Sequence, residues 1–278
     1  MGYNDRYWTN KNERAKNATK HIKEMQDKFS VEIQHSIDKS KIYDDTNIKT
    51  FSSENVPTNT VENLDSVSAA FKYNSGKTAI LNFASYKNPG GGYVNGSSAQ
   101  EESLCEESFL YNVLRNFNKF YEYNNSHLNR ALYTNRAIYS PDVVFEHDGK
   151  TLNLDVITCA APNRSTYIRY NVPAKDKISD FVGNETAEKA NTDILRDRIR
   201  FIKNIAEEQG VKTLILGAFG CGVFRQDAAT VAKMFKEEFS TSSIKTIIHP
   251  VPAGVDKSNY EAFKKVFDGR AIEANEER

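Results

Sequence analysis

The sequence has no excess charge of either sign, because 37 lysine and arginine residues balance 37 aspartate and glutamate residues among 278. A balanced chain creates no long-range field that would draw it to nucleic acid or to an acidic membrane. Any anionic ligand must therefore be held by local groups. We expect no direct nucleic-acid binding and no membrane partner, and we expect a monomer.

Cysteine and long apolar runs are also scarce. The three cysteines, Cys105, Cys159 and Cys221, are odd in number and widely separated, which fits reduced thiols better than a disulfide framework or a zinc site. No segment approaches the roughly 20 apolar residues of a bilayer span, and residues 1–16 lack the apolar core of a signal peptide. These absences predict a cytoplasmic protein with no structural metal and no cofactor.

Apolar residues make up 39% of the chain, enough to fill the core of one large α/β domain or two small ones. From Asn12 to Phe29 they recur every three or four positions, which predicts an amphipathic helix. From Phe29 to Ile37 they alternate, which predicts a strand. Residues 132–154 look extended, with a turn at Asp148-Gly149. After Thr78, buried strands alternate with helices, as in a mixed or mainly parallel sheet covered on both faces.

The most informative stretch is a buried strand that begins at Thr78 and leads into Gly90, Gly91 and Gly92. Successive glycines adopt positive φ freely and let another molecule lie against bare backbone amides. Seven residues later comes Gln100-Glu101-Glu102, just before a predicted helix. The spacing alone also allows a second interpretation, in which Ser98 and Glu101 form an S-x-x-E capping box at the start of that helix.

A second glycine-rich loop, Gly217 to Phe224, follows the predicted strand Val211–Leu216 and precedes a helix capped by Asp227. Backbone amides and a helix start at the end of a parallel strand commonly hold phosphates in open α/β sheets. The glycine order, G-x-x-G-x-G, and the late position exclude the usual dinucleotide-binding fingerprint. An ordinary strand-to-helix turn remains the alternative, although such turns seldom need three glycines in six residues.

Three glycines, a gap of seven residues and Gln-Glu-Glu resemble the signature of poly(ADP-ribose) glycohydrolases. The words NFAS, PGGGYVNG, AQEESLCEES, LYNVL, LYTNRAIYSPDVVF and ITCAAPN resemble the microbial branch of that family, whose core is a macrodomain. The resemblance covers most of residues 10–255. It implies a three-layer α/β/α macrodomain-like mixed sheet with an N-terminal helical extension. We expect residues 1–70 to form this extension, packed on a catalytic core of residues 71–270 in a single structural unit.

The resemblance also implies roles for individual residues. Glu102 would act as general acid and base, and Glu101 would hold the ribose hydroxyls. GAFGCGVF resembles the family's diphosphate-binding loop. The implied substrate contacts are Gln100, Phe83, Ser85, Gly90, Gly91, Gly92, the diphosphate-binding Gly220, Cys221, Gly222 and Val223, and Phe224 against the distal ribose. Ser85 stands where the animal-type enzymes have an asparagine.

The implied function is hydrolysis of ribose glycosidic bonds with release of ADP-ribose from polymer ends. Its partners would be ADP-ribose, poly(ADP-ribose) and ADP-ribosylated macromolecules. Two alternatives belong to other classes: a hydrolase of another ADP-ribose adduct, and a macrodomain that binds ADP-ribose without turnover. The intact Gln-Glu-Glu counts against the second alternative.

Overall fold

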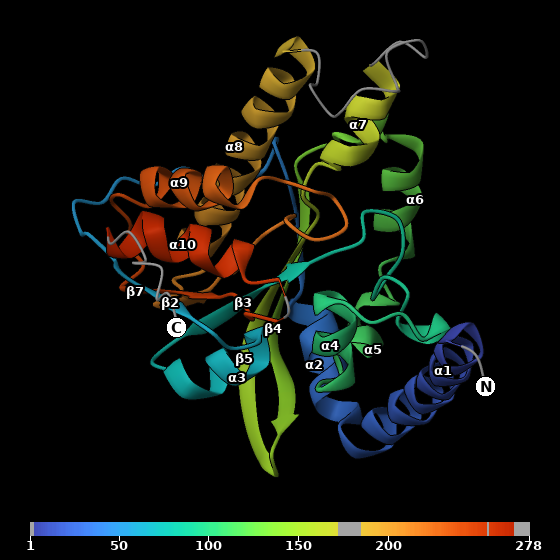
Figure 1. Cartoon of the computed structure of the whole chain (residues 1–278). Coiled ribbons are helices and arrows are strands. Elements are labelled where there is room, and N and C mark those ends of the chain that lie inside the picture. The colour runs from blue at the N-terminus through green and yellow to red at the C-terminus, as the bar shows by residue number, and fades with distance from the viewer. Residues whose placement is uncertain (1–2, 172–184, 255, 270–278) are drawn as a thin grey trace, which may run out of the picture.

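The computed structural model describes residues 3–171, 185–254 and 256–269. They form one seven-stranded mixed sheet in the order β1-β4-β5-β3-β6-β7-β2, with helices on both faces (Figure 1). The strands are β1 (Lys41–Asp44), β2 (Thr58–Glu62), β3 (Thr78–Phe83), β4 (Arg136–His147), β5 (Lys150–Cys159), β6 (Thr213–Ile215) and β7 (Thr246–Pro250). The helices are α1 (Tyr3–Lys28), α2 (Ser30–Lys39), α3 (Ser66–Tyr73), α4 (Gln100–Glu106), α5 (Leu110–Leu114), α6 (Asn118–Ser126), α7 (Arg164–Asn171), α8 (Glu185–Glu208), α9 (Ala228–Glu238) and α10 (Ser258–Asp268).

Strand β3 lies in the middle of the sheet and separates two apolar cores. It pairs in parallel with β5 on one side and with β6 on the other. Ala79 and Leu81 point into the core under α8, α9 and α10, whereas Ile80 points into the core under α1 to α5. Alternate residues of a strand face opposite sides, so an apolar run buried on both faces marks a central strand. The predicted three-layer α/β/α architecture is confirmed.

The antiparallel part of the sheet contains the predicted turn. Strands β4 and β5 form a long hairpin whose turn is Asp148-Gly149, and both turn residues have positive φ, 47° and 72°. Two consecutive residues with positive φ match the twist of a two-residue hairpin loop. This prediction is therefore confirmed.

The predicted strand from Phe29 to Ile37 is wrong, because α2 occupies this segment. Phe29, Ile33 and Ile37 are spaced by four residues, so they fit one face of a helix as well as an alternating strand. Val31 decides between the two, since its side chain is 76% exposed and does not share the buried face of Ile33. A helix packs Phe29, Ile33 and Ile37 toward the core and leaves Val31 in solvent.

Residues before position 70 both complete the sheet and hold the first glycine loop. Strands β1 and β2 are the two edge strands. Helix α1 lies against the 3-10 turn after the glycines, where the Nε of Arg14 donates to the carbonyl of Gly96 at 2.8 Å. Gly96 has φ +71°, and a Cβ there would overlap the carbonyl oxygen of Lys11. The boundary at residue 70 stays a prediction. No helix in the described part of the chain is long and apolar enough to cross a membrane.

Candidate active site

The two glycine-rich loops meet at the carboxyl ends of neighbouring parallel strands. The first follows β3 and the second follows β6. The ring of Phe83, at the end of β3, packs edge-on against Phe219 of the second loop, with centroids 5.7 Å apart. Gly217 also lies directly against Phe83. Because the carboxyl ends of parallel strands share one edge of a sheet, loops far apart in the sequence come together here.

The capping-box interpretation of Glu101 is wrong. Helix α4 begins after Ala99, which has no side-chain cap, and Glu101 turns toward the end of β3 instead. Its Oε2 accepts a 2.6 Å hydrogen bond from the amide of Ser85, and its Oε1 accepts one from the Nδ2 of Asn82 at 3.2 Å. Only 3% of Glu101 is exposed. The start of α4 thus presents a buried carboxyl to the end of β3.

Glu102 faces the first glycine loop. It is 6% exposed, and its Oε1 accepts a 2.8 Å hydrogen bond from the amide of Gly92. Gly91 has φ +60°, and a Cβ there would lie 2.6 Å from the Oε1 of Glu102 and 2.8 Å from the Oε2 of Glu101. Gly90 is packed equally closely, against the ring of Tyr111. Within the triplet, Gly91 is therefore the residue that leaves room for the protein's own carboxyl pair.

Burial governs the charge of Glu101. Removal from water raises its pKa to about 8, because a carboxylate is costly in an apolar surrounding. Hydrogen bonds from Ser85 and Asn82 oppose this rise, whereas the neighbouring charge of Glu102 adds to it. The carboxyl of Glu101 is accordingly protonated in much of the free protein at neutral pH.

Gln100 fastens α4 to β3. Its Oε1 accepts from the amide of Phe83 at 2.9 Å, and its Nε2 donates to the carbonyl of Leu81 at 2.8 Å and to the Oγ of Ser66 at 3.2 Å. The amide thus continues the hydrogen bonding of the strand and fixes where the following two glutamates point. Gln100 reaches the predicted site, with its polar atoms engaged by protein.

Sequence reasoning missed Asn82 as a site residue. Its side chain is fully buried and bridges Glu101 and the Oγ1 of Thr158 on β5. The signal was present, since Asn82 is a lone amide inside an apolar strand, where an unpaired polar group is costly. The hydroxyl of Ser85 accepts from the amides of Lys87 and Asn88 and shapes the turn that leaves β3.

The second loop presents its amides to solvent. Val223 is 80% exposed, and nothing lies within 4 Å of a Cβ built on Gly222. Among the described residues, the backbone amides of Gly220, Gly222, Val223 and Phe224 have no hydrogen-bond acceptor. The amide of Cys221 donates to the carbonyl of Ala218, and burial raises the pKa of its thiol to about 12. Clustered free amides form a ready site for an anion.

The helix after the second loop begins as predicted. Asp227 is the N-cap of α9, and its carboxylate accepts from the amide of Thr230 at 2.8 Å. Phe224 is half-buried, with its ring 6.2 Å from that of Tyr133. The second loop is therefore anchored at its end, while its tip is open.

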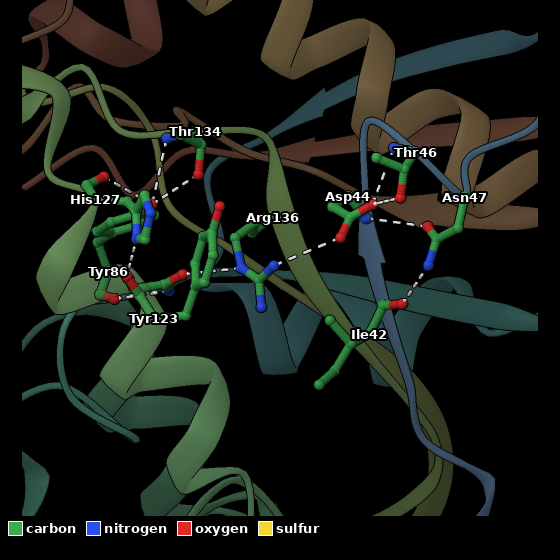
Figure 2. A network of polar contacts seen from close by, with 10 residues as sticks. Ile42, Asp44, Thr46, Asn47, Tyr86, Tyr123, His127, Thr134 and Arg136 are labelled. Carbon is green, nitrogen blue, oxygen red and sulfur yellow. Dashed lines mark hydrogen bonds and ion pairs between the residues drawn. The ribbon is translucent and has the colours of Figure 1, made fainter.

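A polar network supports the segment that Phe224 touches (Figure 2). The hydroxyl of Tyr86 hydrogen-bonds that of Thr134 at 2.8 Å. Arg136 lies over the ring of Tyr123, 4.1 Å from its centroid, and reaches the Oδ2 of Asp44 on β1 at 3.5 Å. These contacts tie the approach to β4 to the edge strand. No group of three metal-ligating side chains converges within the described ranges.

Comparison with known proteins identifies the family and the fold. The family described as "Microbial-type PARG, catalytic domain", where PARG stands for poly(ADP-ribose) glycohydrolase, matches residues 10–148. The chain belongs to this family. The matched residues contain the first glycine loop and both carboxyls, and membership makes the chain a glycosidase-type hydrolase. No curated protein matches it in sequence.

Solved PARG structures share the fold. PARG from Thermomonospora curvata has a TM-score of 0.77 at 22% identity, with 92% of this chain and 100% of that chain covered. Its complex with the inhibitor ADP-HPD has a TM-score of 0.75 at 22% identity, with 91% and 99% covered. PARG from Deinococcus radiodurans in complex with ADP-ribose has a TM-score of 0.70 at 27% identity, with 85% and 97% covered.

Proposed function

We propose that this protein releases ADP-ribose from the ends of poly(ADP-ribose) by hydrolysing the glycosidic bond between ribose units. One observation carries the proposal: Glu102 lies enclosed under the first glycine loop, and the neighbouring second loop keeps the amides of Gly220, Gly222, Val223 and Phe224 without an acceptor among the described residues. The similar Deinococcus radiodurans protein is seen in complex with ADP-ribose. A site for a diphosphate next to a buried carboxyl pair suits that ligand.

The bound ADP-ribose would extend along the edge of the sheet. The amides of Gly220, Gly222 and Val223 would hold its diphosphate, with no need for a positive side chain. A cavity of about 230 Å³ beside them is lined by Phe83, Gln100, Ala218 and Pro250, among others, and would accept the adenosine end. The distal ribose would then lie at the carboxyl pair, against Phe224.

The two carboxyls would do different work. Adjacent residues of a helix point about 100° apart, and here Glu101 faces β3 while Glu102 faces the loop. Glu101, held in place by the amide of Ser85, would fix the ribose hydroxyls. Glu102 would donate its proton to the departing oxygen as the bond from C1 of the ribose breaks through an oxocarbenium-like state. Water then attacks C1, and its proton returns to Glu102.

In this proposal the protein is a cytoplasmic monomer that needs no cofactor and acts on free polymer or on ADP-ribosylated macromolecules. The core from residue 71 to 270 would carry the chemistry, and residues 1–70 would brace it. Neutral overall charge favours capture of a polymer end in the pocket over tracking along a basic surface.

The test is to incubate the protein with purified poly(ADP-ribose) and resolve the products by length with time. Release of single ADP-ribose units from the start, with calorimetric binding of ADP-ribose, supports the proposal. Short oligomers as first products would replace end-trimming by internal cleavage. Binding without any product would leave an ADP-ribose-binding macrodomain, and cleavage of other adducts alone would identify a different substrate.

A further inference from the structure

A second cavity lies beside the candidate active site and takes no part in the scheme above. It measures about 610 Å³ and is formed by the segment after β3, the segment before β4 and helix α7. The residues that matter for its chemistry are Lys87, Arg130, Tyr133, Asn163, Thr166 and Tyr170. We call it the α7 cavity.

The order of strands in the sheet places the α7 cavity on the leaving-group side. The carboxyl pair lies at the end of β3, where Glu101 binds Asn82 and Ser85. The adenosine cavity lies toward β6 and β7, since Ala218 and Pro250 line it. The α7 cavity lies toward β5 and β4, because it is bordered by Tyr133 and Asn163. An ADP-ribose whose adenosine end fills the adenosine cavity therefore leaves the α7 cavity for whatever is attached to its distal ribose.

The wall of the α7 cavity is held in an uncommon backbone conformation. Asn129, Arg130, Ala131 and Tyr133 all have positive φ, between 44° and 75°. Such residues cost about 1 kcal/mol or more each and persist where the surroundings enforce them, often at functional sites. Here the amide of Asn163 donates to the carbonyl of Ala131 at 2.8 Å. The wall is thus preformed.

The buried Arg198 and a stacked tyrosine pair hold the same wall from behind. The guanidinium of Arg198 donates to the carbonyls of Ala160 and Leu132, and to the Oδ1 of Asn135 at 2.6 Å. The rings of Tyr86 and Tyr133 stack with centroids 4.1 Å apart. Figure 2 shows Tyr86 tied in turn to Thr134. These contacts fix the backbone of the wall on the side away from the cavity.

The charge of the lining suits an anion. Lys87 and Arg130 are exposed, and neither forms an ion pair with the described part of the chain. The lining contains no carboxylate among the described residues. The ring of Tyr170 is 69% exposed at the rim. Two cations without an ion pair in the described ranges, together with an exposed aromatic ring, match a nucleotide, because phosphates bind positive charge and a base stacks on aromatic rings.

We propose that the α7 cavity binds the penultimate ADP-ribose unit of the polymer, the leaving group of the reaction. Its diphosphate lies near Lys87 and Arg130, and its adenine stacks on Tyr170. This assignment rests on the proposed function. Lys87 stands between Ser85 and Gly90, in the turn that joins β3 to the first glycine loop, so it is close to the bond that is cut.

The decisive substrate is a purified ADP-ribose dimer, because it has one unit for each cavity. The test variant is Lys87→Glu with Arg130→Glu. The matched control is Arg115→Glu with Lys233→Glu. Arg115 is exposed at the end of α5 and Lys233 is exposed on α9, and the two substitutions make the same change in net charge. Steady-state kinetics on the dimer and calorimetric binding of ADP-ribose are measured for both, with thermal unfolding as a check on folding.

The test variant should raise KM for the dimer about tenfold over the control, since each exposed cation contributes a factor of about three. Its kcat should stay within about twofold, and its Kd for ADP-ribose should match the control. Tyr170→Ala should raise KM at least about threefold without any change of charge. Raising the salt concentration should increase KM of the unaltered protein and leave that of the test variant nearly constant.

Equal KM values for test and control variants would overturn the assignment, as would a loss of ADP-ribose binding in the test variant alone. A defect confined to ADP-ribosylated protein would make a protein segment the occupant and would also overturn it. Lys87→Glu alone decides the matter if the double variant unfolds early, since Lys87 has no strained backbone. If the unaltered protein fails to cleave the dimer, the result counts against the proposed function. That result is distinguishable from failure of the cavity assignment, because it appears before any variant is compared.

Discussion

The two glycine-rich loops look alike in the sequence but are used in opposite ways. The first loop is closed, since a Cβ on Gly91 would strike both Glu101 and Glu102. The tip of the second loop is open, since a Cβ on Gly222 would meet nothing within 4 Å. Glycine allows close approach in both cases, but the approaching group is the protein's own carboxyl pair in one and is left to a ligand in the other.

Under the proposed function, this difference would separate catalysis at the first loop from ligand binding at the second. The first loop gives an amide to Glu102, the proposed general acid and base, whereas the second keeps amides unpaired among the described residues. Substitutions in the closed region should therefore affect turnover and folding. Substitutions at the open tip should affect ligand affinity and leave the fold intact. The predictions below test that division.

The largest effect is expected at Glu102. Glu102→Gln keeps the size of the side chain but cannot transfer a proton, so ADP-ribose release should fall at least about a thousandfold. Calorimetric affinity for ADP-ribose should change little. Glu101→Gln is the matched control and should reduce release less, or act through binding. Undiminished turnover by the Glu102 variant would remove the proposed mechanism.

The second-largest effect is expected for Gly91→Ala, which should reduce release of ADP-ribose about a hundredfold and lower the unfolding temperature. The added methyl meets both carboxyls. The alanine must also adopt a φ of +60°, and this backbone conformation costs about 1 kcal/mol before any clash. Release assays and calorimetric unfolding on the same preparation measure both effects. If this variant behaves like Gly222→Ala in both assays, the distinction between the two loops is lost.

Gly222→Ala should leave the unfolding temperature within about 1 °C, because the methyl points into open space. We expect ADP-ribose affinity to fall several-fold, since the same methyl keeps a diphosphate from the amides of the tip. Calorimetric titration beside thermal unfolding checks both statements. Unchanged affinity would show that the diphosphate lies elsewhere.

The smallest effect concerns the stability of the free protein at different pH. Burial raises the pKa of Glu101 to about 8 from a reference value of 4.5, so folding favours its protonated form. This contribution is fully present below pH 4.5 and is lost as pH rises through about 8. Glu101→Gln should therefore match the unaltered protein near pH 4.5 and unfold at a higher temperature at pH 8.5.

The chain contains a partner for the introduced amide. The Oδ1 of Asn82 is buried without a hydrogen-bond partner, and rotation of its amide would let it accept from the new donor. Thermal unfolding of both proteins from pH 4.5 to 8.5 measures the difference. A gap that shrinks with rising pH would contradict the raised pKa.

Element type followed from the sequence wherever the apolar pattern matched one periodicity. The turn residues Asp148-Gly149 predicted extended structure broken by a turn, and the structure has the turn of the β4–β5 hairpin at these two residues. The pattern from Phe29 to Ile37 matched both two-residue and four-residue periods, and only the burial of Ile33 against the exposure of Val31 decided for a helix. Periodicity shows which residues share a face of an element. Residues four positions apart share a face in a strand and also in a helix, so this spacing does not distinguish the two.

The sequence by itself determined the family, the central strand, the two glycine loops and the pairing of adjacent carboxyls, because each depends on residues that are near neighbours in the chain. Tertiary structure decided what each glycine faces, why Asn82 is buried, and how Lys87, Arg130 and Tyr170 come to border one cavity. Those relations join strands and loops that are tens of residues apart. They arise only when parallel strands bring their carboxyl ends to a common edge, and no local pattern encodes that meeting.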